Sequence, residues 1–174
     1  AVHTVLTKKA QPYELSNYST FTAETASITN EVLLFEYMLR EAKTREEKIA
    51  FLNEALDQIR GSYFRQTMFA EFLLNTHTLA EKGEPLTGER MTQVYCDLLR
   101  RYHGAAKGIM KVDPAYCVEW AFIPHFYRGF YVYNYATSMA GGAYLADAIA
   151  KQGEPARKKL IALLSAGGSD YPYN

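Results

Sequence analysis

The stretch that decides the fold reads TFTAETASITNE, Thr20–Glu31, and it leads directly into the apolar run Val32–Phe35. Apolar side chains recur along it at helical spacing, which predicts a helix with one apolar stripe: Phe21, Ile28, Val32, Phe35 and Leu39. At about 100° per residue, Glu24 and Glu31 fall roughly 20° apart on the flank of this stripe. Carboxylates at the edge of a buried face need a cation or hydrogen-bond donors to hold their charge.

This acidic pair has two interpretations. In the simpler one, both carboxylates reach solvent or pair with Arg or Lys side chains, and the pattern alone favours it. In the sharper one, one carboxylate binds a metal ion and the other supports a neighbouring ligand.

Length and composition bound the possible functions. The 174 residues are enough for one domain with a substantial core. A formal net charge of zero argues against a general binder of nucleic acid or of anionic membranes. No apolar run approaches the roughly 18 residues needed to cross a membrane, and no signal peptide precedes the first segment. Cys96 and Cys117 form no CxxC pair, so we expect no disulfide framework, no thiolate zinc site and a reducing, cytoplasmic compartment.

Helix signals cover the rest of the chain. Ser19 or Thr20 is a good cap for the first long helix, and Thr44 with Glu47 forms a capping box for the next. No segment alternates apolar and polar residues with period two. The sequence therefore predicts a single all-α unit over residues 1–174. Its expected features are a helical start at 1–9, helices over 20–41 and 44–59, a joint at Gly61-Ser62, a central helix over 63–79, and further helices over 88–103, 114–122, 125–151 and 154–166.

A second informative stretch, IPHFYRGFYVYNYATS, spans Ile123–Ser138. On a helix, Tyr127, Tyr131 and Tyr135 would form one hydroxyl-bearing stripe, with His125 near the helix start. Such a stripe is more often a core with bonded hydroxyls than a catalytic wall. A histidine beside it strengthens the functional interpretation, because both groups can donate to a developing oxyanion.

The other histidines carry little signal. His77 and His103 are interpreted as surface or packing residues. No HExxH or ExxH arrangement is present, so the chain contains no complete zinc or di-iron signature, and a carboxylate di-metal bundle is disfavoured.

Taken together and in order, five motifs resemble the zinc oligopeptidases of the oligoendopeptidase F type, in the thimet oligopeptidase superfamily. They are FTAETAS with NEVLL (Phe21–Leu34), RQTMFAEF (Arg65–Phe72), EKGEPLT (Glu81–Thr87), IPHFYRGFYVYNYATS (Ile123–Ser138) and SAGGSDYP (Ser165–Pro172). The resemblance implies a multi-helical part of a zincin-like catalytic domain that hydrolyses internal bonds of short oligopeptides.

The resemblance also implies roles for individual residues. Glu24 would be the third zinc ligand, and Glu31 would hold a ligand histidine in place. His125 and Tyr127 would bind the peptide. Tyr131, Tyr135 or His125 would polarise its carbonyl and stabilise the oxyanion.

The chain departs from the family at its ends. The family places HExGH immediately before a segment like AVHT, which here is Ala1–Thr4. Two zinc histidines and the general-base glutamate are therefore expected outside this chain, as is a helical stretch after SAGGSDYP. We expect a fragment of the catalytic domain, inactive alone, whose partner is the missing N-terminal portion of the same enzyme. The alternative is a non-catalytic helical module that associates through exposed apolar faces.

Overall fold

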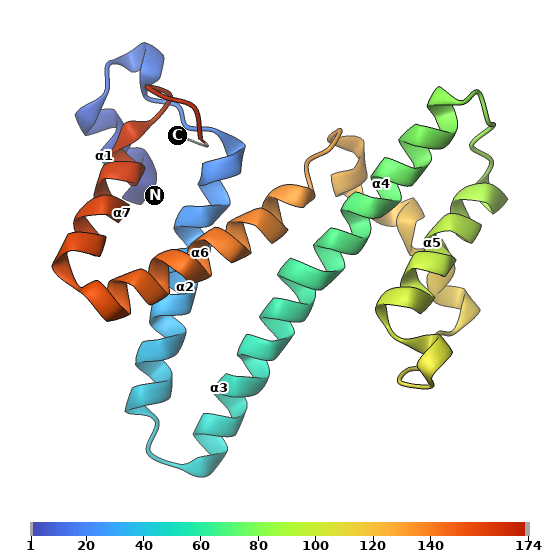
Figure 1. Ribbon diagram of the computed structural model, residues 1–174, viewed down its shortest axis with the longest axis horizontal. Coiled ribbons are helices and arrows are strands. Elements are labelled where there is room, and N and C mark those ends of the chain that lie inside the picture. The colour runs from blue at the N-terminus through green and yellow to red at the C-terminus, as the bar shows by residue number, and fades with distance from the viewer. Residues whose placement is uncertain (1, 173–174) are drawn as a thin grey trace. The chain divides into compact units, whose positions relative to one another are not determined.

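The computed structural model describes residues 2–172 of the 174 (Figure 1). Helices account for most of these residues, turns and irregular segments account for the rest, and none of them is in a strand, which confirms the all-α prediction. The α-helices are α1 (Val2–Ala10), α2 (Thr20–Glu41), α3 (Arg45–Gln58), α4 (Arg65–Glu81), α5 (Gly88–Tyr102), α6 (Tyr133–Gln152) and α7 (Glu154–Ala166). A π-helix, η2 (Ile59–Phe64), precedes α4, and short 3₁₀ helices occur at η1 (Tyr13–Leu15), η3 (Ala105–Lys107), η4 (Pro114–Phe122) and η5 (Pro124–Tyr127). In the described part of the chain, no helix is long and apolar enough to cross a membrane.

The chain contacts divide these elements into two compact units. Unit 1 contains the described residues up to Ile59 and from Asn134 onward, and unit 2 is Arg60–Tyr133. The boundary at Arg60 falls inside η2, which contains the Gly61-Ser62 pair expected to mark a joint. That residues 1–174 act as one unit of a larger catalytic domain stays a prediction.

In unit 1, α1 packs along α7. The hydroxyl of the fully buried Thr7 lies 3.0 Å from the carbonyl oxygen of Leu164, and the Gln11 amide donates to the carbonyl of Ser165 at 3.1 Å. A small apolar cluster of Ala26, Leu160 and Leu164 joins α2 to α7. Buried apolar contacts and satisfied helix carbonyls therefore fix the two ends of the chain onto each other within this unit.

Two side-chain hydrogen bonds join α2 to α6. Ser19 caps α2 as predicted, by accepting a hydrogen bond from the Phe21 amide. The Thr25 hydroxyl donates to Ser138 at 3.2 Å, and Ser138 donates to the Phe21 carbonyl at 3.3 Å. The two helices also pack closely at Gly142, where an added Cβ would lie 2.8 Å from Ile28 Cγ2 and 3.0 Å from the Thr29 nitrogen.

This contact makes Gly142→Ala a test of the α2–α6 packing. We expect the substitution to destabilise the protein by about 1–3 kcal/mol, because the new methyl group meets backbone that cannot yield. Gly141→Ala is the matched control, since its Cβ would meet the Thr25 side chain at ordinary contact distances, 3.5 Å from Cγ2 and 3.9 Å from Oγ1. In a helix it should be neutral, or stabilising by up to about 1 kcal/mol. Thermal unfolding of both variants checks the prediction, and equal midpoints would contradict it.

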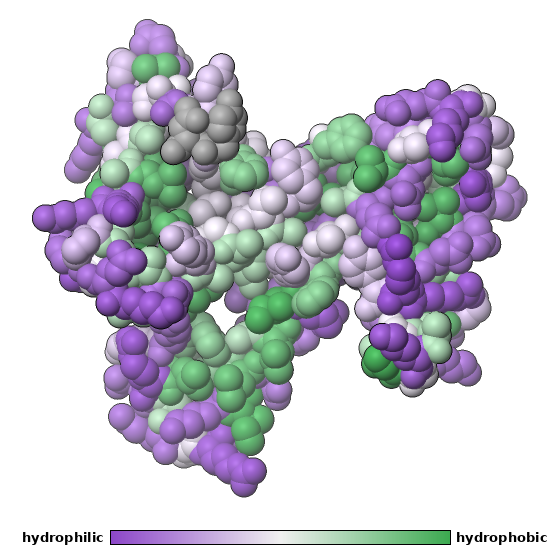
Figure 2. Space-filling model, viewed as in Figure 1, coloured by the Kyte–Doolittle hydropathy of each residue, from purple (hydrophilic) through white to green (hydrophobic). Residues whose placement is uncertain are grey.

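The α2–α3 hairpin carries an apolar surface. The capping box at Thr44 is confirmed, because Thr44 accepts from the Glu47 amide while Glu47 accepts from the amides of Lys43 and Thr44. These backbone donors lower the pKa of the Glu47 carboxyl. The predicted stripe of α3 is largely exposed in the described structure, with Leu56 65% accessible. Figure 2 shows the apolar colouring that gathers over α2 and α3, to which Leu34, Tyr37, Met38, Ile49, Leu52 and Leu56 contribute.

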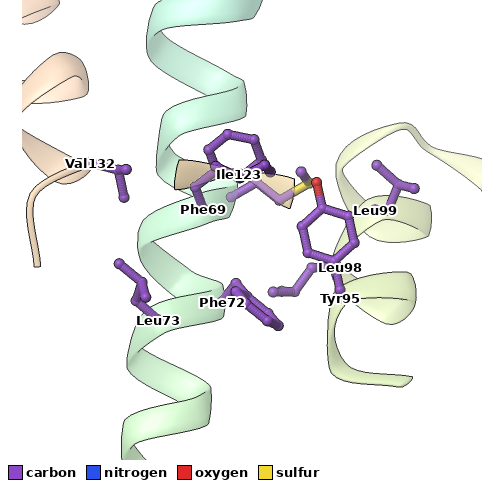
Figure 3. Packing of buried hydrophobic residues seen from close by; sticks show 9 residues of the cluster. Phe69, Phe72, Leu73, Tyr95, Leu98, Leu99, Ile123 and Val132 are labelled. Atoms are coloured by element: carbon purple, nitrogen blue, oxygen red, sulfur yellow. The ribbon is translucent and has the colours of Figure 1, made fainter. Parts of the chain in front are cut away.

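Unit 2 is organised around the apolar face of α4. This helix and α5 run antiparallel side by side (Figure 1), and η4 packs against α5. Figure 3 shows Phe69 and Phe72 of α4 directed toward Tyr95 of α5. The buried cluster consists of Met68, Phe69, Phe72, Leu73, Tyr95, Leu98, Leu99, Ile123 and Val132.

Two sequence-based expectations are wrong in this unit. The long helix predicted over 125–151 begins only at Tyr133, because Phe130 adopts a φ of 51°, which an α-helix cannot contain. The tyrosine stripe therefore does not form: Tyr127 lies in η5, Tyr131 precedes α6, and Tyr135 lies in the first turn of α6. In addition, Cys96 and Cys117 form a disulfide, since the packing of η4 on α5 brings together two residues 21 positions apart.

Candidate functional site

Glu24 lies on the part of α2 that is fixed to α6. Its side chain is half-buried, and the Ser27 hydroxyl donates to its Oε2 at 3.3 Å. The adjacent Thr25 is bonded to Ser138, and Ile28 lies one turn further on, under Gly142. The backbone on this side of Glu24 is therefore held on a neighbouring helix, which restricts the directions its carboxylate can take.

Tyr135 and Glu31 belong to the same unit. Tyr135 is half-buried and lies one turn before Ser138 on α6, so the contact that fixes Glu24 also fixes the helix of Tyr135. Glu31 is exposed, two turns beyond Glu24, and accepts a hydrogen bond from the Gln58 amide of α3. Donors therefore hold both carboxylates, as expected for charges at the edge of a buried face.

His125 and Tyr131 lie together in unit 2. Their ring centroids are 6.0 Å apart with an interplanar angle of 13°, and the Arg128 guanidinium lies 5.6 Å from the Tyr131 ring centroid. His125 is exposed and Tyr131 is half-buried. Tyr127 is 85% accessible, so its hydroxyl is available to a large ligand.

Apolar neighbours that pack on the core of unit 2 hold the turn that carries His125. Ile123 is 8% accessible, and the Phe126 ring lies 5.2 Å from Phe69 and 5.1 Å from Phe72. Residues before and after His125 are therefore anchored in the apolar cluster around α4, while the imidazole between them is exposed. A rigid support for an exposed functional group is typical of binding and catalytic turns.

The predicted site residues thus form two sets. Glu24, Glu31 and Tyr135 are in unit 1, and His125, Tyr127 and Tyr131 are in unit 2. The structure brings Tyr131 to His125 through the turn after η5 rather than through a shared helix face. That the two sets act in one site stays a prediction.

Zinc binding can be tested only for the ligands this chain supplies. Within residues 2–172, no cluster of three or more His, Cys, Asp or Glu side chains could hold a metal ion. Glu24 fits as one ligand, because a carboxylate oxygen is a normal zinc donor and this carboxylate is accessible on a fixed helix. A complete zinc site would need further ligands beyond those the structure describes.

His3 of α1 is buried against Tyr18 in unit 1. Its ring stacks on Tyr18 with centroids 3.6 Å apart, and its Nδ1 has no hydrogen-bond partner within the described residues. Burial lowers the pKa of His3 below its ordinary value of 6.5. The folded protein therefore favours the neutral imidazole.

The His3 environment predicts a loss of stability in acid. Because the folded-state pKa of His3 is lowered, the neutral imidazole makes its full contribution to the stability of the fold above about pH 6.5. This contribution is lost as the pH falls below that value. His3→Phe keeps a ring on Tyr18 but cannot take up a proton. We expect its thermal midpoint to fall less than that of the unmodified protein between pH 7 and pH 5. Parallel pH dependences would contradict the assignment.

Sequence reasoning missed the polar cluster around Glu119 in unit 2. Glu119 of η4 forms an ion pair with Arg65 of α4 and accepts a hydrogen bond from the Tyr95 hydroxyl of α5 at 2.5 Å. The available signal was a single acidic residue within the otherwise apolar AYCVEWAF segment. A lone charge in such a segment is buried with partners.

A cavity of about 950 Å³ opens beside Arg65 in unit 2, between the start of α4, the end of α5 and η3. Basic side chains line it, together with apolar residues such as Met68 and Ile109. None of the predicted site residues lines this cavity, so its position does not bear on their roles.

Comparisons with known proteins agree with the resemblance drawn from the motifs. The family model Peptidase family M3 matches residues 1–174. Oligopeptidase PepF of Bacillus subtilis is 47% identical over 172 residues, which cover 99% of this chain and 25% of that protein. Group B oligopeptidase PepB of Streptococcus agalactiae is 41% identical over 175 residues, which cover 100% of this chain and 28% of that protein.

Two solved structures share the fold. The crystal structure of oligoendopeptidase-F from Enterococcus faecium superimposes with a TM-score of 0.81 at 39% identity, over 98% of this chain and 31% of that one. The crystal structure of a putative peptidase from Chlamydophila abortus superimposes with a TM-score of 0.87, also at 39% identity, over 98% of this chain and 28% of that one. The chain therefore spans about a quarter to a third of the length of the relatives it matches.

Proposed function

Because this chain belongs to peptidase family M3, we propose that its protein is a zinc-dependent endopeptidase that hydrolyses internal bonds of short oligopeptides. The observation that carries the proposal is the match of the family model over the whole chain, together with relatives named as oligopeptidases and oligoendopeptidases. The activity is assigned to the whole protein, of which this chain contributes one part. A cytoplasmic location belongs to the same proposal.

In this proposal, Glu24 supplies one carboxylate ligand to zinc. When bound, zinc lowers the pKa of a water molecule so that a nucleophile forms near neutral pH. The α2–α6 contact at Thr25 and Ser138 holds the Glu24 backbone, which limits the ligand's freedom before metal arrives. Glu31 orients a ligand histidine from the other portion of the enzyme, as carboxylates commonly do for zinc-bound imidazoles.

His125, Tyr131 and Tyr135 act on the peptide. The imidazole of His125 and the phenol of Tyr131, stacked at 6.0 Å, present two donors on one turn to a substrate carbonyl oxygen. Tyr135 offers a third hydroxyl from a helix fixed to that of Glu24. Donors held in place before the reaction stabilise the negative charge that develops on the oxygen. The exposed Tyr127 binds the peptide chain.

Glu24→Ala in the intact protein tests the metal assignment. We expect tight zinc binding to be lost, because the remaining ligands leave the site one donor short. Elemental analysis of the purified protein measures zinc per chain. Glu41→Ala, which removes an exposed carboxylate from the same helix, should retain the metal. Full zinc content in Glu24→Ala would refute the assignment.

Tyr135→Phe and Tyr131→Phe test stabilisation of the oxyanion. Whichever of the two hydroxyls donates to the oxyanion, its loss should lower kcat by about 10²–10³-fold and leave the zinc content unchanged. Steady-state cleavage of a quenched fluorescent oligopeptide provides the measurement. Tyr144→Phe, on an exposed residue of the same α6 helix, is the control and should keep the original kcat. A tyrosine whose removal leaves kcat unchanged has no part in the mechanism.

A second candidate function, a non-catalytic helical interaction module, rests on the exposed apolar surface of the α2–α3 hairpin (Figure 2). A surface of this kind is typical of association with another protein surface. Cleavage of the quenched oligopeptide by the intact protein, abolished by a chelator and restored by zinc, separates the two candidates. Absence of cleavage at full zinc loading would favour the interaction module.

A further inference from the structure

A single carboxylate joins three elements of unit 2. Glu119 of η4 accepts a hydrogen bond from the Tyr95 hydroxyl of α5 at 2.5 Å and pairs with Arg65 of α4. The Glu119 side chain is 19% accessible and Tyr95 is fully buried. Hydrogen bonds to an ionised, largely buried carboxylate are stronger than those between neutral groups.

Burial raises the pKa of Tyr95, and the hydrogen bond to Glu119 raises it further. The phenol therefore stays protonated throughout the physiological range and remains a donor to Glu119. The Tyr95–Glu119 hydrogen bond is therefore a structural attachment rather than a titrating switch.

A contact chain leads from Glu119 to His125. Arg65 lies over the Phe69 ring at 4.7 Å from its centroid, and the Phe69 ring contacts Phe126 at 5.2 Å, edge to face. Phe126 is the next residue after His125. The guanidinium that pairs with Glu119 thus also supports the ring on which the turn of His125 rests.

Glu119 also fixes the segment that leads into this turn. Two other attachments join η4 to α5, the Trp120 indole donating to Thr92 at 3.1 Å and the Cys96–Cys117 disulfide. Neither reaches α4. Glu119 adds a polar attachment of η4 to both helices on which the core of unit 2 is built, through Arg65 of α4 and Tyr95 of α5.

We propose that Glu119 is a positioning residue: its bridge to Arg65 and Tyr95 sets the placement of the turn that carries His125 and Tyr131. It does not touch the substrate in this assignment. The catalytic consequence rests on the function proposed above, whereas the placement itself does not. Small displacements of donors cost rate, because the transition state needs them in fixed positions.

The chain contains a matched control. Glu71 of α4 accepts a hydrogen bond from the Tyr102 hydroxyl at 2.9 Å and pairs with Arg101, both on α5. The chemistry is the same set of carboxylate, phenol and guanidinium, but it joins only α4 and α5. Glu71→Gln therefore reports what is lost when such a set is weakened without affecting η4.

The first measurement is kinetic, on the intact zinc-loaded protein. For Glu119→Gln we expect kcat to fall about tenfold to a hundredfold with KM changed less than about threefold, because donors are displaced but binding surface remains. Glu71→Gln should keep kcat within about twofold of the unmodified protein. Tyr95→Phe removes one hydrogen bond of the same bridge and should give a smaller loss of kcat. It replaces Glu119→Gln as the test variant if Glu119→Gln does not fold. Equal kcat losses in the Glu119 and Glu71 variants would overturn the proposal.

The second measurement does not depend on activity. Hydrogen exchange of the backbone amides in residues 123–131 should become faster in Glu119→Gln and in Tyr95→Phe, and should stay unchanged in Glu71→Gln. Unchanged exchange of this segment in the Glu119 and Tyr95 variants would overturn the positioning role. If the unmodified protein cleaves no peptide at full zinc loading, the proposed function fails. The exchange data then still decide the positioning of the turn.

Discussion

The structure of unit 2 depends on burial of the aromatic face of α4. Phe69 and Phe72 contact Tyr95 of α5 on one side and Phe126 of η5 on the other, so one helix face organises both neighbours. Large rings supply much of the buried apolar area that a small unit can gain. Because Phe126 belongs to this core, the histidine before it is exposed and yet held, which is the combination a reactive turn requires.

Local signals explain what the sequence predicted well. Ser19 and Thr44 cap their helices where expected, because a side chain that accepts from the first free amides acts within one turn of backbone. The helix break at Phe130 was missed because tyrosines four residues apart fit helical periodicity and one glycine is tolerated within a helix. The Phe130 ring contacts His77 at 4.5 Å, a tertiary contact that the periodicity of the stretch does not encode.

The candidate site was predictable only in part. The proximity of His125 and Tyr131 was expected, but from a helix face that does not exist; a short turn brings the rings together instead. Glu119 and the Cys96–Cys117 disulfide could not be found from spacing, since both depend on how η4 packs against α5. The roles of Glu24 and Glu31 came from ordered motifs, and the structure contributes the contacts that hold their helix.

The exposed apolar stripe of α3 affects the solubility of the polypeptide. Leu56, Ile49 and Leu52 are 65%, 46% and 46% accessible, while the chain has no net charge and an isoelectric point near 7.1. At neutral pH, electrostatic repulsion between copies is therefore at its weakest, and attraction between exposed apolar side chains is unopposed. The solubility of this polypeptide by itself should pass through a minimum near neutrality, so its behaviour in solution depends on buffer pH as much as on its fold.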